Sequence, residues 1–231
     1  MKEIIQIMKN LDYSPLYISV STGIVATIIS FLLGVYIAGK VYCSDRRFKA
    51  VIDGILTLPM VLPPTVAGFI LLMIFSKRRP IGEFIFNTFN IQVVQSWLGC
   101  VVAATVIAFP IMYQNAVAAF KQVDEDIISA AKTLGMSEGK IMRRVLIPAA
   151  KPGILSGIVL CFTRAMGEYG ATSMLAGNIP GKTGTISQKI AMVVQNGDYV
   201  SAGIWVVIVL LISLILIVAT NLIAGYGKNK H

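Results

Sequence analysis

The sequence predicts an all-α, polytopic membrane protein, and three observations support this fold class. Hydrophobic residues make up 56% of the 231 positions and charged residues only 13%, whereas a soluble domain carries roughly 25% charged residues. Several uncharged runs reach the length of about 20 residues with which a helix crosses the hydrocarbon core of a bilayer. One charged stretch, residues 123–148, interrupts these runs and has apolar residues at helical spacing. We therefore expect a single membrane domain, residues 1–231, with about five transmembrane helices and one amphipathic insert.

The uncharged runs define the expected spans. They cover residues 16–39, 54–75, 96–119, 153–175 and 201–224. Tyrosines flank the first run and Trp97 begins the third, as in the aromatic belts of membrane interfaces. We expect Pro110 to kink the third span, polar loops at residues 40–49 and 76–95, and a short amphipathic piece at 186–194.

The second run contains Pro59, Pro63 and Pro64. Proline removes a backbone donor and breaks regular helix. Irregular backbone at membrane depth is tolerated where protein or a water-filled cavity covers it. The run is therefore either a kinked helix or a stretch that lines the space between helices.

The distribution of lysine and arginine predicts the topology. An odd number of spans places the two termini on opposite sides of the membrane. Twelve lysines and arginines lie in one set of connecting segments, residues 40–49, 120–151 and 226–231. Seven lie in the other set, residues 1–15, 76–95 and 177–199. The positive-inside rule then predicts a cell-membrane protein with its N-terminus outside and its C-terminus in the cytoplasm. The net charge of +9 thus reflects topology, and nucleic acid is not an expected partner.

The charged stretch 123–148 is predicted to form two short amphipathic helices joined by a glycine turn. Asp124 is a good N-cap for the first helix, and Gly135 fits the left-handed position after its end. Ser137 is expected to cap the second helix, and Pro148 to end it or turn it into the next span. A charged, folded element between apolar spans indicates docking to something outside the membrane.

Several kinds of chemistry are excluded by what the sequence lacks. Cys43, Cys100 and Cys161 are isolated, and the single histidine is His231, so we expect no metal site, no cofactor and no disulfide. The segment GNIPGKT at residues 177–183 has three residues between its glycines, whereas a phosphate-binding loop needs four. A turn is sufficient to explain it. No catalytic constellation is present, so the chain is not expected to be an enzyme, and any ATP hydrolysis must belong to a partner.

Two charged residues fall inside the fourth expected span. Arg164 and Glu168 are four residues apart, which places them on one face of a helix. They can form an ion pair that fastens this helix to a neighbour, or Arg164 can present positive potential to a passing anion. Gly167 and Gly170 allow close helix approach or bending. With Pro63 and Pro64, these residues are candidates for the translocation path or for helix packing.

The charged stretch also resembles the EAA motif of ABC importer permeases, E-A-A-x(3)-G-x(9)-I-x-L-P. The residues at these offsets are Ser129, Ala130, Ala131, Gly135, Val145, Ile147 and Pro148. The alanine pair, the glycine and the proline are kept, while Ser129 stands where the motif has glutamate. Three longer stretches are similar to molybdate permease subunits, namely residues 56–75, 130–157 and 163–186.

This resemblance implies a type I ABC importer permease fold and a role as the transmembrane subunit of a molybdate importer. It also implies a homodimer, two cytoplasmic ABC ATPase subunits and an external oxyanion-binding protein as partners. The expected ATPase-coupling residues are Ser129, Ala130, Ala131, Thr133, Leu134, Gly135, Met136, Ser137 and Pro148. Tungstate, sulfate or another oxyanion remain alternative substrates. A secondary transporter is disfavoured, because such folds commonly contain repeats with equal numbers of spans.

Overall fold

The computed structural model describes residues 11–42 and 46–228, so the expectations for Cys43 and His231 lie outside the described range. Every regular element within it is a helix, and the prediction of an all-α chain is confirmed. The long elements are α2 (Ser14–Tyr42), α3 (Arg46–Val61), α4 (Pro64–Phe75), α6 (Trp97–Lys121), α10 (Lys151–Met166) and α13 (Tyr199–Lys228). The shorter ones are α5 (Pro80–Phe89), α7 (Glu125–Thr133), α8 (Glu138–Ile141), the π-helical turn η1 (Met142–Leu146), α9 (Ile147–Ala149), α11 (Gly170–Leu175) and α12 (Ile186–Gln195).

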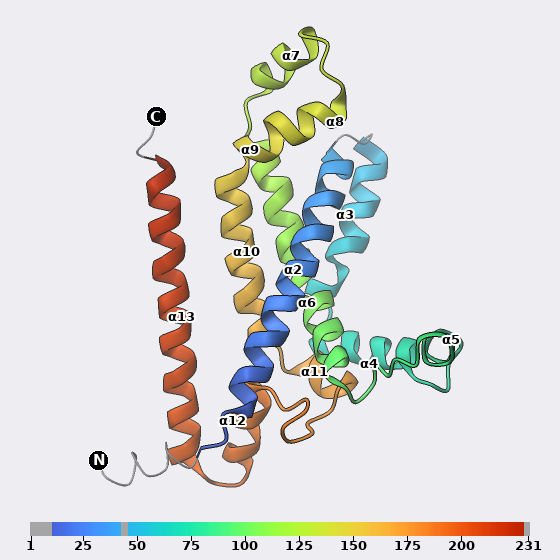
Figure 1. The fold of residues 1–231 in the computed structure, drawn as a ribbon, viewed down its shortest axis with the longest axis vertical. Coiled ribbons are helices and arrows are strands. Elements are labelled where there is room, and N and C mark those ends of the chain that lie inside the picture. The colour runs from blue at the N-terminus through green and yellow to red at the C-terminus, as the bar shows by residue number, and fades with distance from the viewer. Residues whose placement is uncertain (1–10, 43–45, 229–231) are drawn as a thin grey trace.

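Helices α2, α6 and α10 form the centre of the molecule (Figure 1). Their contacts are built largely from fully buried alanines, such as Ala26, Ala104 and Ala108. Small residues let helix backbones approach closely in a membrane, where dispersion contacts rather than hydrophobicity hold helices together. Gly34 marks one such approach, because a Cβ there would lie 3.1 Å from Met112 Cγ. Pro110 lies within α6, which continues without a break from Trp97 to Lys121.

Two of the expected spans are broken rather than continuous. The second run divides at residues 62–63 into α3 and α4, whose axes are bent by 107°. Pro63 and Pro64 cause this break, because neither can donate the hydrogen bond that would continue α3. The expectation of one continuous fourth span was also wrong: α10 ends at Met166, and the separate helix α11 begins at Gly170.

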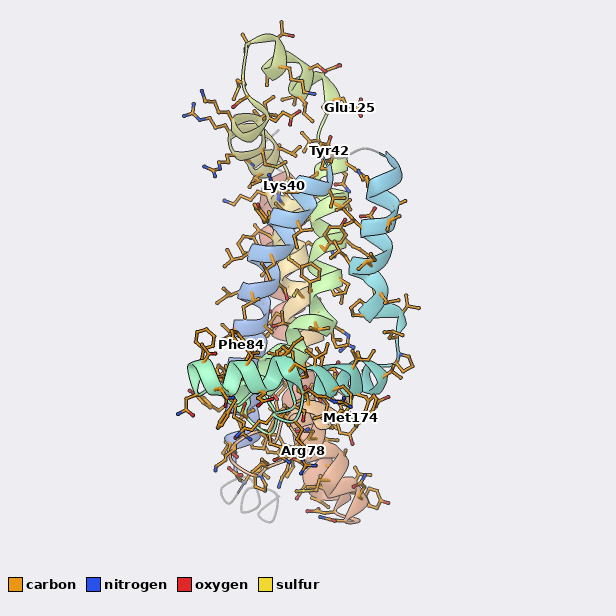
Figure 2. The ribbon with its side chains drawn as sticks, turned by 90° about the vertical axis from the view of Figure 1, so that its right-hand side faces the viewer. Lys40, Tyr42, Arg78, Phe84, Glu125 and Met174 are labelled. Carbon is orange, nitrogen blue, oxygen red and sulfur yellow. The ribbon has the colours of Figure 1, made fainter. Side chains whose placement is uncertain are left out.

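Helices α4 and α5 lie across the long axis of the molecule (Figures 1 and 2). The segment 76–95, predicted as a polar loop, therefore contains a helix that the sequence analysis missed. Helix α4 packs against α11 and α6 through a second core. Its buried members are Ala67, Leu71, Ala103, Ile107, Ala171 and Leu175.

By length and apolar composition, α2 and α6 are long enough to cross a membrane. Up to four spans result if each bent pair, α3 with α4 and residues 138–149 with α10, counts as one. Helix α13 is apolar over Tyr199–Ile215 and contacts α10 and α12. Helices α2, α3, α6, α10 and α13 run along the long axis of the molecule (Figure 1).

The connecting segments gather at two ends of this bundle. Helices α7 and α8 lie at the same end as the last turn of α2 and the last turn of α13 (Figure 1). Helices α5 and α12 and the first turn of α2 lie toward the other end. Within residues 11–42 and 46–228, the two sets of segments that differ in lysine and arginine content therefore lie at opposite ends.

The loop after α11 is the turn predicted for residues 177–183. Gly177 and Gly181 have positive φ angles of 69° and 71°. The backbone amides of Lys182, Thr183 and Gly184 all donate to the carbonyl of Ile179. All three amides are therefore hydrogen-bonded within the turn. A phosphate-binding loop, in contrast, leaves its backbone amides free to bind the phosphate.

Candidate functional site

Helix α7 is capped at both ends as the sequence predicts. The Asp124 carboxylate accepts a hydrogen bond from the backbone amide of Asp126 at 2.9 Å. At the other end, the amide of Gly135 donates to Lys132 and the amide of Met136 donates to Ala131. Together with the φ angle of +74° at Gly135, these bonds form a Schellman motif. The predicted glycine turn is therefore confirmed, and it is fixed by its own backbone.

The second helix of the segment agrees with the prediction only in part. Ser137 occupies the N-cap position of α8, but its side chain makes no capping hydrogen bond. Pro148 does not end the helix, which passes through the π-helical turn η1 and continues to Ala149. The wider π turn precedes the residue that lacks an amide hydrogen, and such turns often occur at functional sites. The chain then bends by 72° into α10.

Most of the expected coupling residues lie on the outside of this segment. Ser129, Ala130, Thr133, Leu134, Gly135, Ser137 and Pro148 are exposed, Met136 is half-buried and Ala131 is buried. Leu134, directly after α7, is 82% exposed, and Ile127 on α7 is 51% exposed. The segment is held to the rest of the chain by Val123 and Leu146, which belong to the main core, and by Ile128 and Met142, which pack against it. Large apolar side chains at the tip of a charged element indicate a surface that a partner covers.

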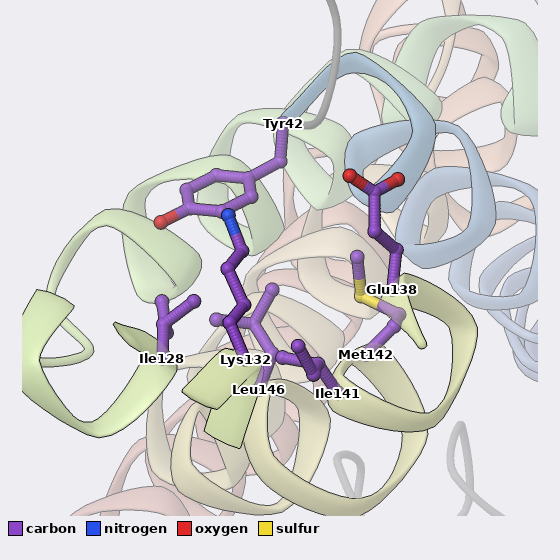
Figure 3. Close-up of a pocket in the computed structure, with 7 residues that line it drawn as sticks. All are labelled: Tyr42, Ile128, Lys132, Glu138, Ile141, Met142 and Leu146. Atoms are coloured by element: carbon purple, nitrogen blue, oxygen red, sulfur yellow. The ribbon is translucent and has the colours of Figure 1, made fainter. Parts of the chain in front are cut away.

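A cavity of about 260 Å³ separates α7 and α8 from the end of α2. It is lined by Tyr42, Ile128, Lys132, Glu138, Ile141, Met142 and Leu146 (Figure 3). Lys132 extends toward the ring of Tyr42, and the floor of the cavity is apolar. On this side the cavity lies between the two short helices and the end of α2, while Ile128, Met142 and Leu146 pack on the main core.

The charged pair of the fourth expected span forms an ion pair at the end of α10. Arg164 Nη1 lies 2.7 Å from Glu168 Oε2, and the side chains are 34% and 2% exposed respectively. The other carboxylate oxygen of Glu168 accepts a hydrogen bond from the amide of Ala171 at 2.8 Å. Because Glu168 lies beyond the last residue of α10, its carboxylate joins α10 to the beginning of α11.

The remaining path candidates meet where α4 begins. A Cβ at Gly170 would lie 3.0 Å from Pro64 Cβ, and one at Gly68 would lie 2.7 Å from Ala171 Cα. The close approach therefore excludes a Cβ at Gly68 and leaves little room for one at Gly170. Gly167 differs, because it ends α10 with an ordinary φ of −86° and a Cβ there would make only an ordinary contact. The structure thus brings Gly170 against Pro64, which follows Pro63, and Glu168 of the ion pair lies two residues before Gly170.

One polar contact was missed by the sequence analysis. The hydroxyl of Tyr113 on α6 donates a hydrogen bond to the carboxylate of Asp53 on α3. Tyr113 is buried and stacks on Phe109. A carboxylate next to an apolar run is costly in a membrane and needs a partner. The acidic residue was visible in the sequence, but its partner 60 positions away was not.

Three comparisons with known proteins agree with one another. Residues 4–226 match the family model described as binding-protein-dependent transport system inner membrane component. The chain is 38% identical over 205 residues to YvgM of Bacillus subtilis (strain 168), named for a molybdenum transport system, covering 89% of this chain and 90% of that protein. It is 35% identical to the molybdenum transport system permease protein ModB of Escherichia coli (strain K12), covering 82% and 83%. It is 30% identical to the sulfate transport system permease protein CysT of Salmonella typhimurium (strain LT2), covering 88% and 73%.

Solved structures share the fold at low identity. The inward-facing MetNI methionine ABC transporter matches with a TM-score of 0.72 and 16% identity, covering 95% of this chain and 97% of that chain. A bacterial ABC transporter that imports the acidic polysaccharide alginate matches with a TM-score of 0.73 and 11% identity, covering 98% and 83%. The predicted fold of a type I ABC importer permease is confirmed.

Proposed function

Because the chain belongs to the family of binding-protein-dependent transport system inner membrane components, we propose that it forms the path by which molybdate enters the cell. Molybdate is proposed as the substrate because the chain is 38% and 35% identical in sequence to relatives named for molybdenum transport, over most of each chain. Relatives named for sulfate transport reach 30–33%, which favours sulfate as the second candidate. Tungstate, with similar shape and charge, is the third.

The working unit that we propose is a complex. The whole chain, residues 1–231, acts as one permease domain and pairs with a second copy of itself. Two separate ABC ATPases bind on the cytoplasmic side, and an oxyanion-binding protein delivers substrate on the outside. The end of the bundle with the greater number of lysines and arginines faces the cytoplasm, so the N-terminus is outside and the C-terminus inside. Exposed Leu134 and Ile127 support a protein partner at this end.

ATP hydrolysis in this scheme belongs to the ATPases, and residues 129–137 are the surface that binds them. Closure of the two ATPases displaces α7 and α8, and the displacement passes through the bend at residues 150–152 to α10. Alternating access then follows as a rigid-body movement of packed helices. The packing supports this transfer, because a Cβ at Gly153 would lie 2.6 Å from Ala119 Cβ and Ala150 is buried.

The contacts of Arg164 and Glu168 favour a fastening role over direct binding of the anion. Glu168 uses both carboxylate oxygens within the chain, and the pair neutralises its own charge. Pro63, Pro64, Gly167 and Gly170 then shape the break and packing beside the path. Uptake that survives Arg164→Gln supports this role, and loss of uptake with normal folding supports contact with the anion.

Reconstitution tests the function directly. The permease is placed in proteoliposomes with its candidate ATPase and binding protein, and ATP hydrolysis is measured with molybdate, tungstate or sulfate outside. Stimulation by molybdate at the lowest concentration is the expected result. Strong stimulation by sulfate or tungstate without stimulation by molybdate would overturn the substrate, and hydrolysis that no oxyanion stimulates would overturn the transport role.

A further inference from the structure

A cavity of about 560 Å³ lies between the end of α2 and the α8–η1 segment. We name it the interfacial cavity. Residues on α2 that line it include Tyr36, Gly39 and Lys40, and residues on η1 and α9 include Met142, Arg143 and Ile147. A Cβ at Gly39 would lie 3.1 Å from Met142 Cε. The two walls therefore touch at one point, where glycine admits the methionine, and are open beside it.

The rim of the interfacial cavity carries two cations. Lys40 and Arg143 are both exposed, and the Lys40 ammonium lies 5.9 Å from the centroid of the Tyr36 ring. Within the described part of the chain, neither cation forms an ion pair with a carboxylate. Glu138 also lines the cavity, so the three charges sum to +1. The cavity thus matches a ligand that carries a single negative charge.

An apolar surface leads from the hydrocarbon region to this rim. Ile24, Ile28, Leu32 and Tyr36 are all exposed and follow one another at four-residue intervals on α2, which places them in one stripe that ends at Lys40. An entirely apolar groove of about 340 Å³ lies at its lower part, lined by Ile24, Ile28 and Phe162 among others.

The dimensions of this surface fit one leaflet of a bilayer. Twelve residues separate Ile28 from Lys40, which corresponds to about 18 Å along a helix. The hydrocarbon region of one leaflet is roughly 15 Å thick, half of the core. Lys40, in the last turn of a helix long enough to span the membrane, therefore lies at headgroup level when Ile28 lies near the bilayer centre. Figure 2 shows Lys40 at the same end of the bundle as Tyr42 and Glu125.

We propose that the interfacial cavity binds an anionic phospholipid. Its phosphate lies between Lys40 and Arg143, and one acyl chain follows the stripe from Tyr36 to the groove at Ile28. A singly charged headgroup neutralises the cavity, whereas a zwitterionic headgroup leaves it charged. Basic pockets between membrane helices bind anionic headgroups in this way. The bound lipid would bridge α2 and η1, which touch directly at Gly39 and Met142.

The test measures lipid retention by the purified full-length protein. The protein is extracted from vesicles that contain equal amounts of phosphatidylglycerol and phosphatidylcholine, and the bound lipids are quantified by native mass spectrometry. Phosphatidylglycerol should be retained preferentially. Lys40→Gln and Arg143→Gln should each weaken its retention on the order of fivefold, since one cation near a membrane surface contributes about that factor. Arg144→Gln is the matched control, because Arg144 is exposed next to Arg143 but does not line the cavity.

Three results would overturn the proposal. Equal retention of both lipids would exclude recognition of the negative charge by the cavity. Equal effects of Arg144→Gln and Arg143→Gln would show that the basic surface as a whole attracts the lipid. Displacement of phosphatidylglycerol by millimolar molybdate or phosphate would identify the cavity as a site for free anions. Thermal unfolding of each variant in detergent is measured alongside, and Lys40→Arg, which keeps the charge, should retain the lipid. These readouts do not involve transport, so they are independent of the proposed substrate.

Discussion

Replacement of Gly135 should perturb the glycine turn through the backbone conformation and not through a steric clash. Its φ angle is +74°, and a Cβ at this position would meet no heavy atom within 4 Å. The effect of a side chain is therefore conformational: the left-handed region costs an L-residue roughly 1–2 kcal/mol. Gly135→Val should approach the upper value because it is β-branched, and Gly135→Asn should cost much less because asparagine adopts this region readily. If ATPase binding requires the observed turn, the affinity should fall by up to about 30-fold in the valine variant.

The assay compares two quantities in proteoliposomes, the affinity of the ATPase for the permease and the uptake achieved per ATP hydrolysed. Gly139→Ala provides the control, because a Cβ at Gly139 is equally free of contacts and the residue lies inside the short helix α8. Thermal unfolding shows whether each variant is folded. The reasoning is refuted if Gly135→Val binds the ATPase and transports as the wild type does, or if the asparagine variant is impaired as strongly as the valine variant.

Three further substitutions have definite expected outcomes. Leu134→Ala should leave the stability of the isolated subunit unchanged but weaken ATPase binding roughly tenfold or more, since burial of a leucine contributes about 1.5–3 kcal/mol; unchanged affinity in a binding titration would contradict this. Arg164→Gln should lower thermal stability by leaving the Glu168 carboxylate without its counterion, and added Glu168→Gln should restore most of the loss; a double variant as unstable as the single one would argue against the pair. Tyr113→Phe should cost about 1–2 kcal/mol in unfolding free energy, because Asp53 loses its donor; an unfolding midpoint equal to that of the wild type would exclude this contribution.

The features that the sequence predicted well are governed by local chemistry. The cap at Asp124 and the turn at Gly135 depend on bonds between residues at most five positions apart. Long uncharged runs likewise yielded α2, α6 and α13, because the requirement to satisfy backbone groups in a bilayer favours continuous helix. In each case the information lies within one segment of the chain.

The features that were missed depend on distant parts of the chain. Hydropathy is the same for one 22-residue helix and for two helices bent by 107°, so it could not separate α3 from α4. The bend persists because Gly68 and Gly170 allow α4 to pack closely on α11. Helix α5 was obscured for a different reason: it is amphipathic and short, and its polar residues were read as a loop. The contact between Asp53 and Tyr113 joins two spans and has no local signal.

The contacts at the two ends of α10 make this helix the physical link between the exposed turn and the second core. Sixteen residues give a helix of about 24 Å. At one end the chain bends by 72° through buried Ala150, directly below the segment that carries Leu134. At the other end Glu168 binds both Arg164 and the amide of Ala171, against which Gly68 of α4 packs. In the proposed mechanism, a displacement of the exposed turn reaches α4 without any helix having to unfold, because closely packed helices move as rigid bodies. We infer that the ion pair stabilises this link even though it binds no anion, because Glu168 contacts both Arg164 on α10 and the amide of Ala171 on α11.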